Sequence, residues 1–216
     1  MNVIEKLCLD GSDKEKIAEE VTGSPEYITQ LLDGLSHDKG RVRLGCDKVL
    51  RLISERQPTL IYGHFDIFVM MLDSDNNILK WSAIITISNL VSVDTDGKFE
   101  KIFKKYYLPI AGKTMITASN IIKNSWKIAL AKPALIEKIT QEILKAEKAK
   151  YINKGQLSPE CNNIVCGNAI DSFDKFYDKI KNKKPVTGFV KRQLKNTRKP
   201  VVKRAEKFLK KHKIGL

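Results

Sequence analysis

The sequence predicts an all-α fold, a right-handed α-α superhelix built from about five helix pairs. The first observation is an internal repeat: segments 38–53 and 75–90 begin 37 residues apart and carry apolar or small residues at matching places. Those places follow the spacing i, i+4, i+7, i+8 and i+11, which is one face of a helix. The second observation is that each segment comes after a leucine and a short polar turn. Both predict a helix, a tight turn and a second helix as the repeated unit.

Helix-start signals divide the rest of the chain. Pro58 and Pro133 stand 75 residues apart, which is two periods, and the tripeptide Ser-Pro-Glu occurs at 24–26 and again at 158–160. Proline is favoured at the first position of a helix, where its missing N–H does no harm. The predicted pairs are 25–36 with 39–56, 58–72 with 76–93, 97–109 with 113–131, 133–152 with 159–181, and 186–196 with 199–213. Before them we expect a short helix over 2–9 and a helix over 13–21 that begins with a capping box at Ser12 and Glu15.

These pairs resemble HEAT repeats. The residues that carry the resemblance are the turn aspartates Asp38 and Asp75, the Val42-Arg43 pair followed by the small Cys46, and the helix-opening Pro58 and Pro133. The third pair departs from the pattern, with Met-Ile-Thr at 115–117 where Val-Arg is expected. The resemblance implies an armadillo-like α-solenoid. It implies three regions: capping helices over 1–23, HEAT-like repeats over 24–150, and degenerate repeats with a basic end over 151–216.

Composition and local sequence predict a folded core, a cellular location and the state of the cysteines. The hydrophobic content of 42% is enough for a continuous core. The N-terminus lacks a basic segment followed by a long apolar run, so we predict a cytoplasmic protein without membrane association. The four cysteines do not form a disulfide or zinc pattern, and we expect them to be reduced thiols.

No catalytic, cofactor-binding or metal-binding residues are predicted. The stretch before Thr114 ends in Gly112-Lys113, as a phosphate-binding loop does, but Tyr107 stands where that loop needs its first glycine. We therefore expect an ordinary turn. Enzymatic activity is left open, with a non-catalytic role favoured.

Two other groups of residues have alternative interpretations. The aspartates at 171, 174 and 178 share a helical face with Lys175 and Lys179, which favours ion pairs within the helix; a divalent-cation site is the alternative. Trp81 and Trp126 are expected to pack between repeats. A HEAT-like family of DNA glycosylases holds damaged nucleotides with tryptophans, but its catalytic arrangement does not match this sequence.

The strongest functional signal is a charge gradient. Residues 1–100 contain 11 Lys and Arg against 17 Asp and Glu, whereas residues 181–216 contain 14 against 1. On a helix over 199–213, Val201, Ala205, Phe208 and Leu209 form the expected buried stripe, which leaves the basic residues in solvent. The candidate anion-binding or nucleic-acid-binding residues are Lys191, Arg192, Lys195, Arg198, Lys199, Lys203, Arg204, Lys207, Lys210 and Lys211.

The favoured function is a non-catalytic scaffold or adaptor that binds a protein partner through its concave face, lined by the second helices. The alternative is binding to a nucleic-acid backbone through the basic C-terminal helices. A solvated lysine-rich surface without a ligand is the third interpretation of the same charges. The acidic and basic halves would also permit head-to-tail association, so the oligomeric state is left open.

Overall fold

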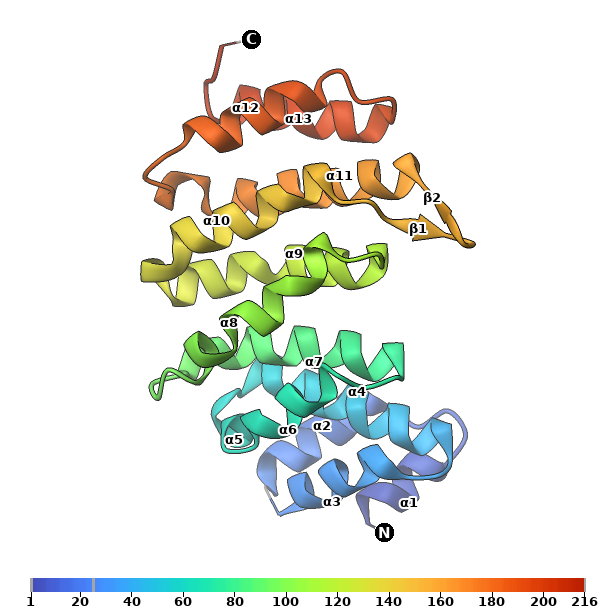
Figure 1. The fold of residues 1–216 in the computed structure, drawn as a ribbon. Helices are drawn as coiled ribbons and strands as arrows, with labels where there is room; N and C mark the ends of the chain where they lie inside the picture. Colours follow the sequence, from blue (N-terminus) through green and yellow to red (C-terminus); the bar gives the residue numbers. More distant parts are fainter. Residues whose placement is uncertain (1, 25, 216) are drawn as a thin grey trace. The chain divides into compact units, whose positions relative to one another are not determined.

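The computed structural model describes residues 2–24 and 26–215 (Figure 1). Pro25, in the first predicted Ser-Pro-Glu start, lies outside the described residues. The described chain forms thirteen α-helices, several short 3-10 segments and one two-stranded hairpin, which confirms the all-α prediction. Its contacts divide it into two compact units, residues 1–102 and residues 103–216. No described helix combines the length and the apolar character that a membrane span needs.

The first unit is built from helix pairs with a preceding pair of short helices. Its helices are α1 (Val3–Cys8), α2 (Lys14–Gly23), α3 (Tyr27–Asp33), α4 (Gly40–Arg56), α5 (Thr59–Tyr62), α6 (Phe65–Met71), α7 (Asn77–Leu90) and the beginning of α8 (Lys98–Tyr107). The long helix α4 packs against both α2 and α7, and α6 packs against α7. The second helices of the pairs thus lie side by side, and the shorter first helices cover one side of them.

Local side chains fix where the first helices begin. Asn2 and Glu5 form a reciprocal capping box at α1. The prediction of a capping box at Ser12 and Glu15 is wrong. Asp13 is the N-cap of α2, and its carboxylate accepts hydrogen bonds from the backbone N–H groups of Glu15 and Lys16. The Ser12 hydroxyl instead accepts a hydrogen bond from the Lys14 ammonium at 2.8 Å. Asp is as good an N-cap as Ser, so one residue of difference leaves the helix itself in place.

Two small residues allow close packing against α4. Cys46 is fully buried, as its place in the repeat predicts. A Cβ atom on Gly34 would lie 2.4 Å from the Cys46 Sγ atom. A larger residue at either position would therefore push the 3-10 turn at Gly34–Ser36 away from the helix.

The second unit repeats the two-layer arrangement. Its helices are the end of α8, α9 (Met115–Ala131), α10 (Ile136–Leu144), α11 (Pro159–Phe176), α12 (Lys184–Gln193) and α13 (Lys199–Lys211). Helix α11 packs between α9 and α13, while α10 packs against α9 and α12 packs against α13. The second helices α9, α11 and α13 therefore form one layer. The pairs predicted over 97–131 and 186–213 are observed with shifts of a few residues.

Two predicted first helices are wrong in part. The helix predicted over 58–72 is broken at Gly63 and His64 into α5 and α6. The helix predicted over 133–152 ends at Leu144 and is followed by the 3-10 segment η5 (Lys145–Lys148). After it comes an antiparallel hairpin of β1 (Ile152–Asn153) and β2 (Gln156–Leu157).

The hairpin has both a local and a distant cause. Its two-residue turn is Lys154-Gly155, with φ angles of 51° and 79°. Two consecutive positive φ angles are what the tight hairpin turn demands, and a glycine at the second position is favoured. The distant cause is Tyr151, which is 1% exposed and donates its hydroxyl hydrogen to the Ile110 carbonyl at 2.8 Å. The buried ring fixes the chain just before β1 against the turn at Ile110.

Candidate partner-binding surface

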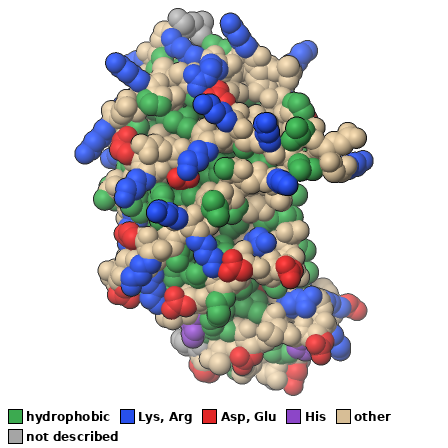
Figure 2. All heavy atoms as spheres, viewed as in Figure 1, with side chains coloured by type: hydrophobic (Ala, Val, Ile, Leu, Met, Phe, Trp, Pro, Cys, Tyr) green, Lys and Arg blue, Asp and Glu red, His purple; other side chains and the backbone are tan. Residues whose placement is uncertain are grey.

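Charge is the property that most distinguishes the second unit. Residues 103–216 contain 27 Lys and Arg against 8 Asp and Glu, whereas residues 1–102 contain 12 against 17. In the face drawn in Figure 2, Lys and Arg side chains are spread over the second unit, with few acidic ones among them. An excess of one charge on a surface raises the local concentration of ions of the opposite charge. The second unit would therefore attract an anionic partner more strongly than the first unit would.

The predicted basic end is observed on α12 and α13. Val201, Ala205, Phe208 and Leu209 are buried, as the sequence predicts. Four of the ten candidate residues form ion pairs: Arg192 with Glu147, Arg198 with Glu160, Arg204 with Asp171, and Lys211 with Asp174. The other six are exposed and have no carboxylate partner among the described residues. They are Lys191, Lys195, Lys199, Lys203, Lys207 and Lys210. The ammonium groups of these six lysines are thus not engaged by a carboxylate of the described chain, whereas the four paired residues are.

A second group of basic side chains surrounds Asp171, and we call it the three-helix cluster. It consists of Lys123 on α9, Lys175 on α11, and Arg204 and Lys207 on α13. Arg204 Nη1 lies 3.0 Å from Asp171 Oδ2, and Lys207 lines a small surface pocket with both residues. Burial raises the pKa of Asp171; Arg204, Lys123 and Lys175 oppose that rise, and Asp174 adds to it.

The members of this cluster come from three successive second helices. The four cations outnumber the two carboxylates beside them, Asp171 and Asp174, so the cluster keeps a positive excess. Only Arg204 and Lys207 were predicted as candidates. Lys123 and Lys175 could not be found from the sequence, because neither α9 nor α11 carries a dense group of basic residues and the helices meet only through tertiary packing.

Trp126 lies beside the three-helix cluster. The Lys175 ammonium is 4.1 Å from the centre of the Trp126 ring, a cation–π contact that favours a charged group over the aromatic face. The indole is half-buried. It packs at the surface of the second-helix layer with a lysine above it.

The aspartates of α11 contact α13 and not the lysines of their own helix. Asp174 Oδ2 accepts a hydrogen bond from Lys211 at 2.9 Å, and Asp174 Oδ1 lies 2.9 Å from His212 Nε2. Burial would raise the pKa of Asp174, but the hydrogen bonds from Lys211 and His212 hold it below its usual value. In place of the ion pairs predicted within α11, the structure has ion pairs between α11 and α13.

The buried thiols are poor nucleophiles. Burial raises the pKa of Cys46 and of Cys166 to about 12, and the neutral thiol is much less reactive than the thiolate. Within residues 2–24 and 26–215, no three His, Cys, Asp or Glu side chains converge as metal ligands would.

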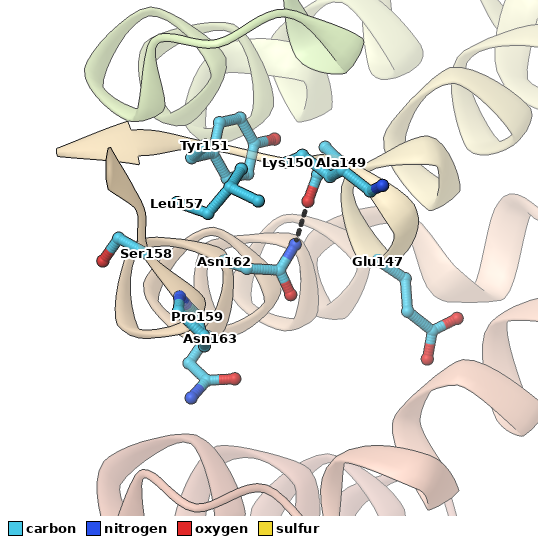
Figure 3. A pocket seen from close by; sticks show the side chains of 9 residues that line it. All are labelled: Glu147, Ala149, Lys150, Tyr151, Leu157, Ser158, Pro159, Asn162 and Asn163. Atoms are coloured by element: carbon cyan, nitrogen blue, oxygen red, sulfur yellow. Dashed lines mark hydrogen bonds between the residues drawn. The ribbon is translucent and has the colours of Figure 1, made fainter. Parts of the chain in front are cut away.

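The pocket in Figure 3 lies between η5, the hairpin and the start of α11. The side-chain amide of Asn162 donates to the carbonyls of Ala149 and Ala146 at 2.9 and 2.8 Å. At its edge, Glu147 binds Arg192 through two contacts of 2.8 Å. These polar groups join η5 and the segment after it to α11 and α12, and they fix the backbone of that segment.

Comparison with known proteins identifies the fold. No family model matches the sequence, and neither does any curated protein. Among solved structures, the Pds5–Scc1 complex matches 86% of this chain and 28% of that chain, with 15% identity and a TM-score of 0.55. For a designed armadillo repeat protein in complex with the peptide (KR)4, the match covers 96% of this chain and 97% of that chain, with 14% identity and a TM-score of 0.51. For an engineered protein, it covers 99% of this chain and 98% of that chain, with 14% identity and a TM-score of 0.51.

The fold is an α-solenoid of the armadillo/HEAT type. The resemblance drawn from the repeat residues is thereby confirmed at the level of architecture. At 14 to 15% identity the likeness shows the fold of this solenoid and nothing of its activity.

Proposed function

We propose that this protein is a non-catalytic scaffold and that the second-helix layer of residues 103–216 binds an extended, acidic segment of a protein partner. The observation that carries the proposal is the three-helix cluster, in which α9, α11 and α13 each contribute basic side chains around Asp171 and the neighbouring Asp174. A row of cations across parallel helices offers repeated contacts to carboxylates along an extended chain.

The fold supports this use. Repeat proteins present equivalent positions of successive helices along one face, which suits extended peptides. The designed armadillo protein described above holds a peptide of alternating lysine and arginine. The surface proposed here is basic, so the complementary ligand would carry the opposite charge. Lys175 stacked over Trp126 adds a platform with an apolar edge.

The test is binding of a labelled peptide of alternating aspartate and glutamate, measured by fluorescence anisotropy at several salt concentrations. The variant is Lys123→Gln with Lys175→Gln, which removes charges from two helices without touching the predicted basic end. We expect it to weaken binding about tenfold, as the loss of two charge-assisted contacts would.

The matched control is Lys195→Gln with Lys199→Gln, which removes the same charge from the basic end, and it should bind like the wild type. A lysine–arginine peptide should not bind. Equal weakening in the variant and the control would refute a specific surface, because it would mean that only net charge matters.

The second candidate function is sequence-independent contact with a nucleic-acid backbone through α12 and α13. It is favoured by the six exposed lysines that have no carboxylate partner among the described residues. Neutralising about five or six phosphates makes log K fall with log salt at a slope of about −5. The aromatic side chains of these two helices, Phe189 and Phe208, are buried, so base stacking is not expected.

Duplex DNA and duplex RNA of mixed sequence test this second candidate. The variant replaces Lys191, Lys195, Lys199, Lys203 and Lys210 with glutamine and leaves the three-helix cluster intact. Loss of both affinity and most of the salt slope would support backbone binding at this end. An unchanged slope would place the contact elsewhere, and absence of binding by the wild type at low salt would reject it.

A further inference from the structure

A group of lysines away from both surfaces described so far gathers around one pocket. The pocket is open, has a volume of about 510 Å³, and lies between the turn that precedes α9 and the segment 145–150. Its lining residues are Ala111, Lys113, Lys145, Lys148, Ala149 and Lys150. Four of these six are lysines and none is acidic. Two separate stretches of chain therefore bring like charges to one place.

Specific hydrogen bonds join those two stretches. The Ile152 N–H donates to the Lys113 carbonyl at 2.9 Å, which ties the strand after Lys150 to the turn before α9. One residue earlier, the buried hydroxyl of Tyr151 donates to the Ile110 carbonyl at 2.8 Å. The lysines at 113 and 150 are thus held on backbones that are bonded to each other, and their proximity does not depend on flexible side chains alone.

The segment 145–150 is also fixed from its other side, by α11. The Asn162 amide group donates to the Ala149 carbonyl (Figure 3) and to the Ala146 carbonyl, on either side of Lys148. A neutral side chain that bonds two carbonyls fixes the path of the chain without adding any charge. Lys148 and Lys150 therefore project from a segment of defined shape.

The nearby carboxylates are occupied by other partners. Glu142 pairs with Lys145 at 2.6 Å, and Glu147 is bound by Arg192. Lys113, Lys148 and Lys150 have no carboxylate partner in the part of the chain that the structure describes. Three ammonium groups held together without a counter-charge repel one another, and a bound anion would relieve that repulsion.

We propose that this pocket binds the phosphate chain of a small polyphosphorylated ligand, with Lys113, Lys148 and Lys150 as its direct contacts. Lysine binds phosphate as a point charge with three donors, and three lysines around an open pocket match a chain of two or three phosphates. Lys113 also directly precedes Thr114, the N-cap of α9, which makes no side-chain capping bond. The positive end of that 17-residue helix adds to the potential.

This site does not depend on a glycine-rich loop. The sequence around Gly112 and Lys113 lacks the first glycine of such a loop, and the structure has no strand before it in the described chain. The charge comes instead from side chains of segments that are more than 30 residues apart. The inference is independent of the proposed function, since none of these lysines belongs to the three-helix cluster or to the predicted basic end.

The test is calorimetric titration with sodium tripolyphosphate at low salt, using the full chain. The variant is Lys113→Gln, Lys148→Gln and Lys150→Gln; all three side chains are exposed, so the fold should be retained. The matched control removes the same charge from α13 with Lys199→Gln, Lys203→Gln and Lys210→Gln. We expect one site per chain, an affinity at least about tenfold lower in the pocket variant, and a change of less than about twofold in the control.

Additional titrations separate the sources of such a ligand. ATP binding as tightly as tripolyphosphate would mean that the phosphate chain alone is recognised, and tighter binding of ATP would mean that a nucleotide is. Sodium sulfate at matched ionic strength should compete weakly. The proposal fails if tripolyphosphate does not bind at low salt, or if the pocket variant and the control lose affinity equally.

Discussion

The two units share a two-layer arrangement of helices but use charge in opposite ways. In the first unit, several cations are paired with carboxylates: Arg41 with Asp10, Arg56 with Glu15, and Lys6 with Glu20. Carboxylates remain in excess there. In the second unit the few carboxylates pair with some of the cations, and many lysines remain. Because solvated surface charge contributes little to stability, one architecture tolerates either excess. The difference is consistent with the proposed function, in which the second unit binds an anionic partner.

The interiors of the units differ less, with one exception. In each, an asparagine on one second helix donates to a serine on the neighbouring one: Asn89 to Ser54 at 2.9 Å, and Asn168 to Ser119 at 3.0 Å. The exception lies in the first unit, which buries two carboxylates: Asp47 on α4 is 7% exposed and Asp94 is 6% exposed. Matched substitutions in the two units therefore test which stabilising interactions both units share and which belong to one unit only.

The largest expected effect comes from a cavity in either core. Phe68 in the first unit and Phe173 in the second are at most 1% exposed, so each Phe→Ala change should lower the free energy of unfolding by about 3–5 kcal/mol. Hydrogen exchange resolved along the chain should show the loss of protection in the unit that carries the change. Equal loss throughout the chain would show that the two units unfold as one.

Asp47→Asn should have the next largest effect and the opposite sign. Burial raises the pKa of Asp47 to about 6, although the nearby Ser82 hydroxyl and Arg51 lower it. The folded state therefore binds this proton more tightly than the unfolded state, whose pKa is near 3.8. Stability should be greatest below that value and fall as the pH rises to about 6. Asparagine stays neutral, so the variant should gain about 1–3 kcal/mol at neutral pH.

Urea denaturation between about pH 4 and pH 7 measures this difference. The wild type should lose stability across the window, whereas the variant should vary less. A variant that is less stable than the wild type at neutral pH would mean that the electrostatic attraction of Asp47 to Arg51 outweighs the effect of burial.

The shared asparagine–serine bonds should contribute about equally. Asn89→Ala and Asn168→Ala each leave a buried serine hydroxyl without this donor, so each should lower the free energy of unfolding by about 1–3 kcal/mol. Double-mutant cycles with Ser54→Ala and Ser119→Ala isolate the bonds. Strictly additive losses in one unit would show that its pair is not energetically coupled.

The smallest effects are expected at the surface, where the units differ most in charge. Arg192→Gln breaks the pair with Glu147, in which the arginine side chain is 59% exposed, and should lower stability by at most about 1 kcal/mol. Lys203→Gln removes an unpaired charge and should leave stability unchanged or raise it by a few tenths of a kcal/mol at low salt. Thermal melts at low and high salt compare the two. A clear loss with Lys203→Gln would reveal a structural role for that lysine.

Much of the fold could be predicted because its signals are local. The stripe of Val201, Ala205 and Leu209 follows from helical spacing, and helix starts follow from residues within one turn of them. The hairpin at 152–157 was missed because the Tyr151 hydroxyl binds a carbonyl 41 residues away. The predicted N-cap of α2 was wrong by one residue, because Ser12 and Asp13 are both favourable N-cap residues and the N-cap is Asp13.

For the candidate sites, the sequence by itself determined the helix-pair architecture and the position of the positive charge along the chain. Only the tertiary structure decided which charges are neutralised and which are brought together. Arg192, Arg198, Arg204 and Lys211 are paired with acids from 33 to 45 residues away, and Lys113 joins Lys148 and Lys150 across a similar interval. Helical periodicity fixes neighbours three or four residues apart, whereas contacts between helices depend on how whole pairs stack.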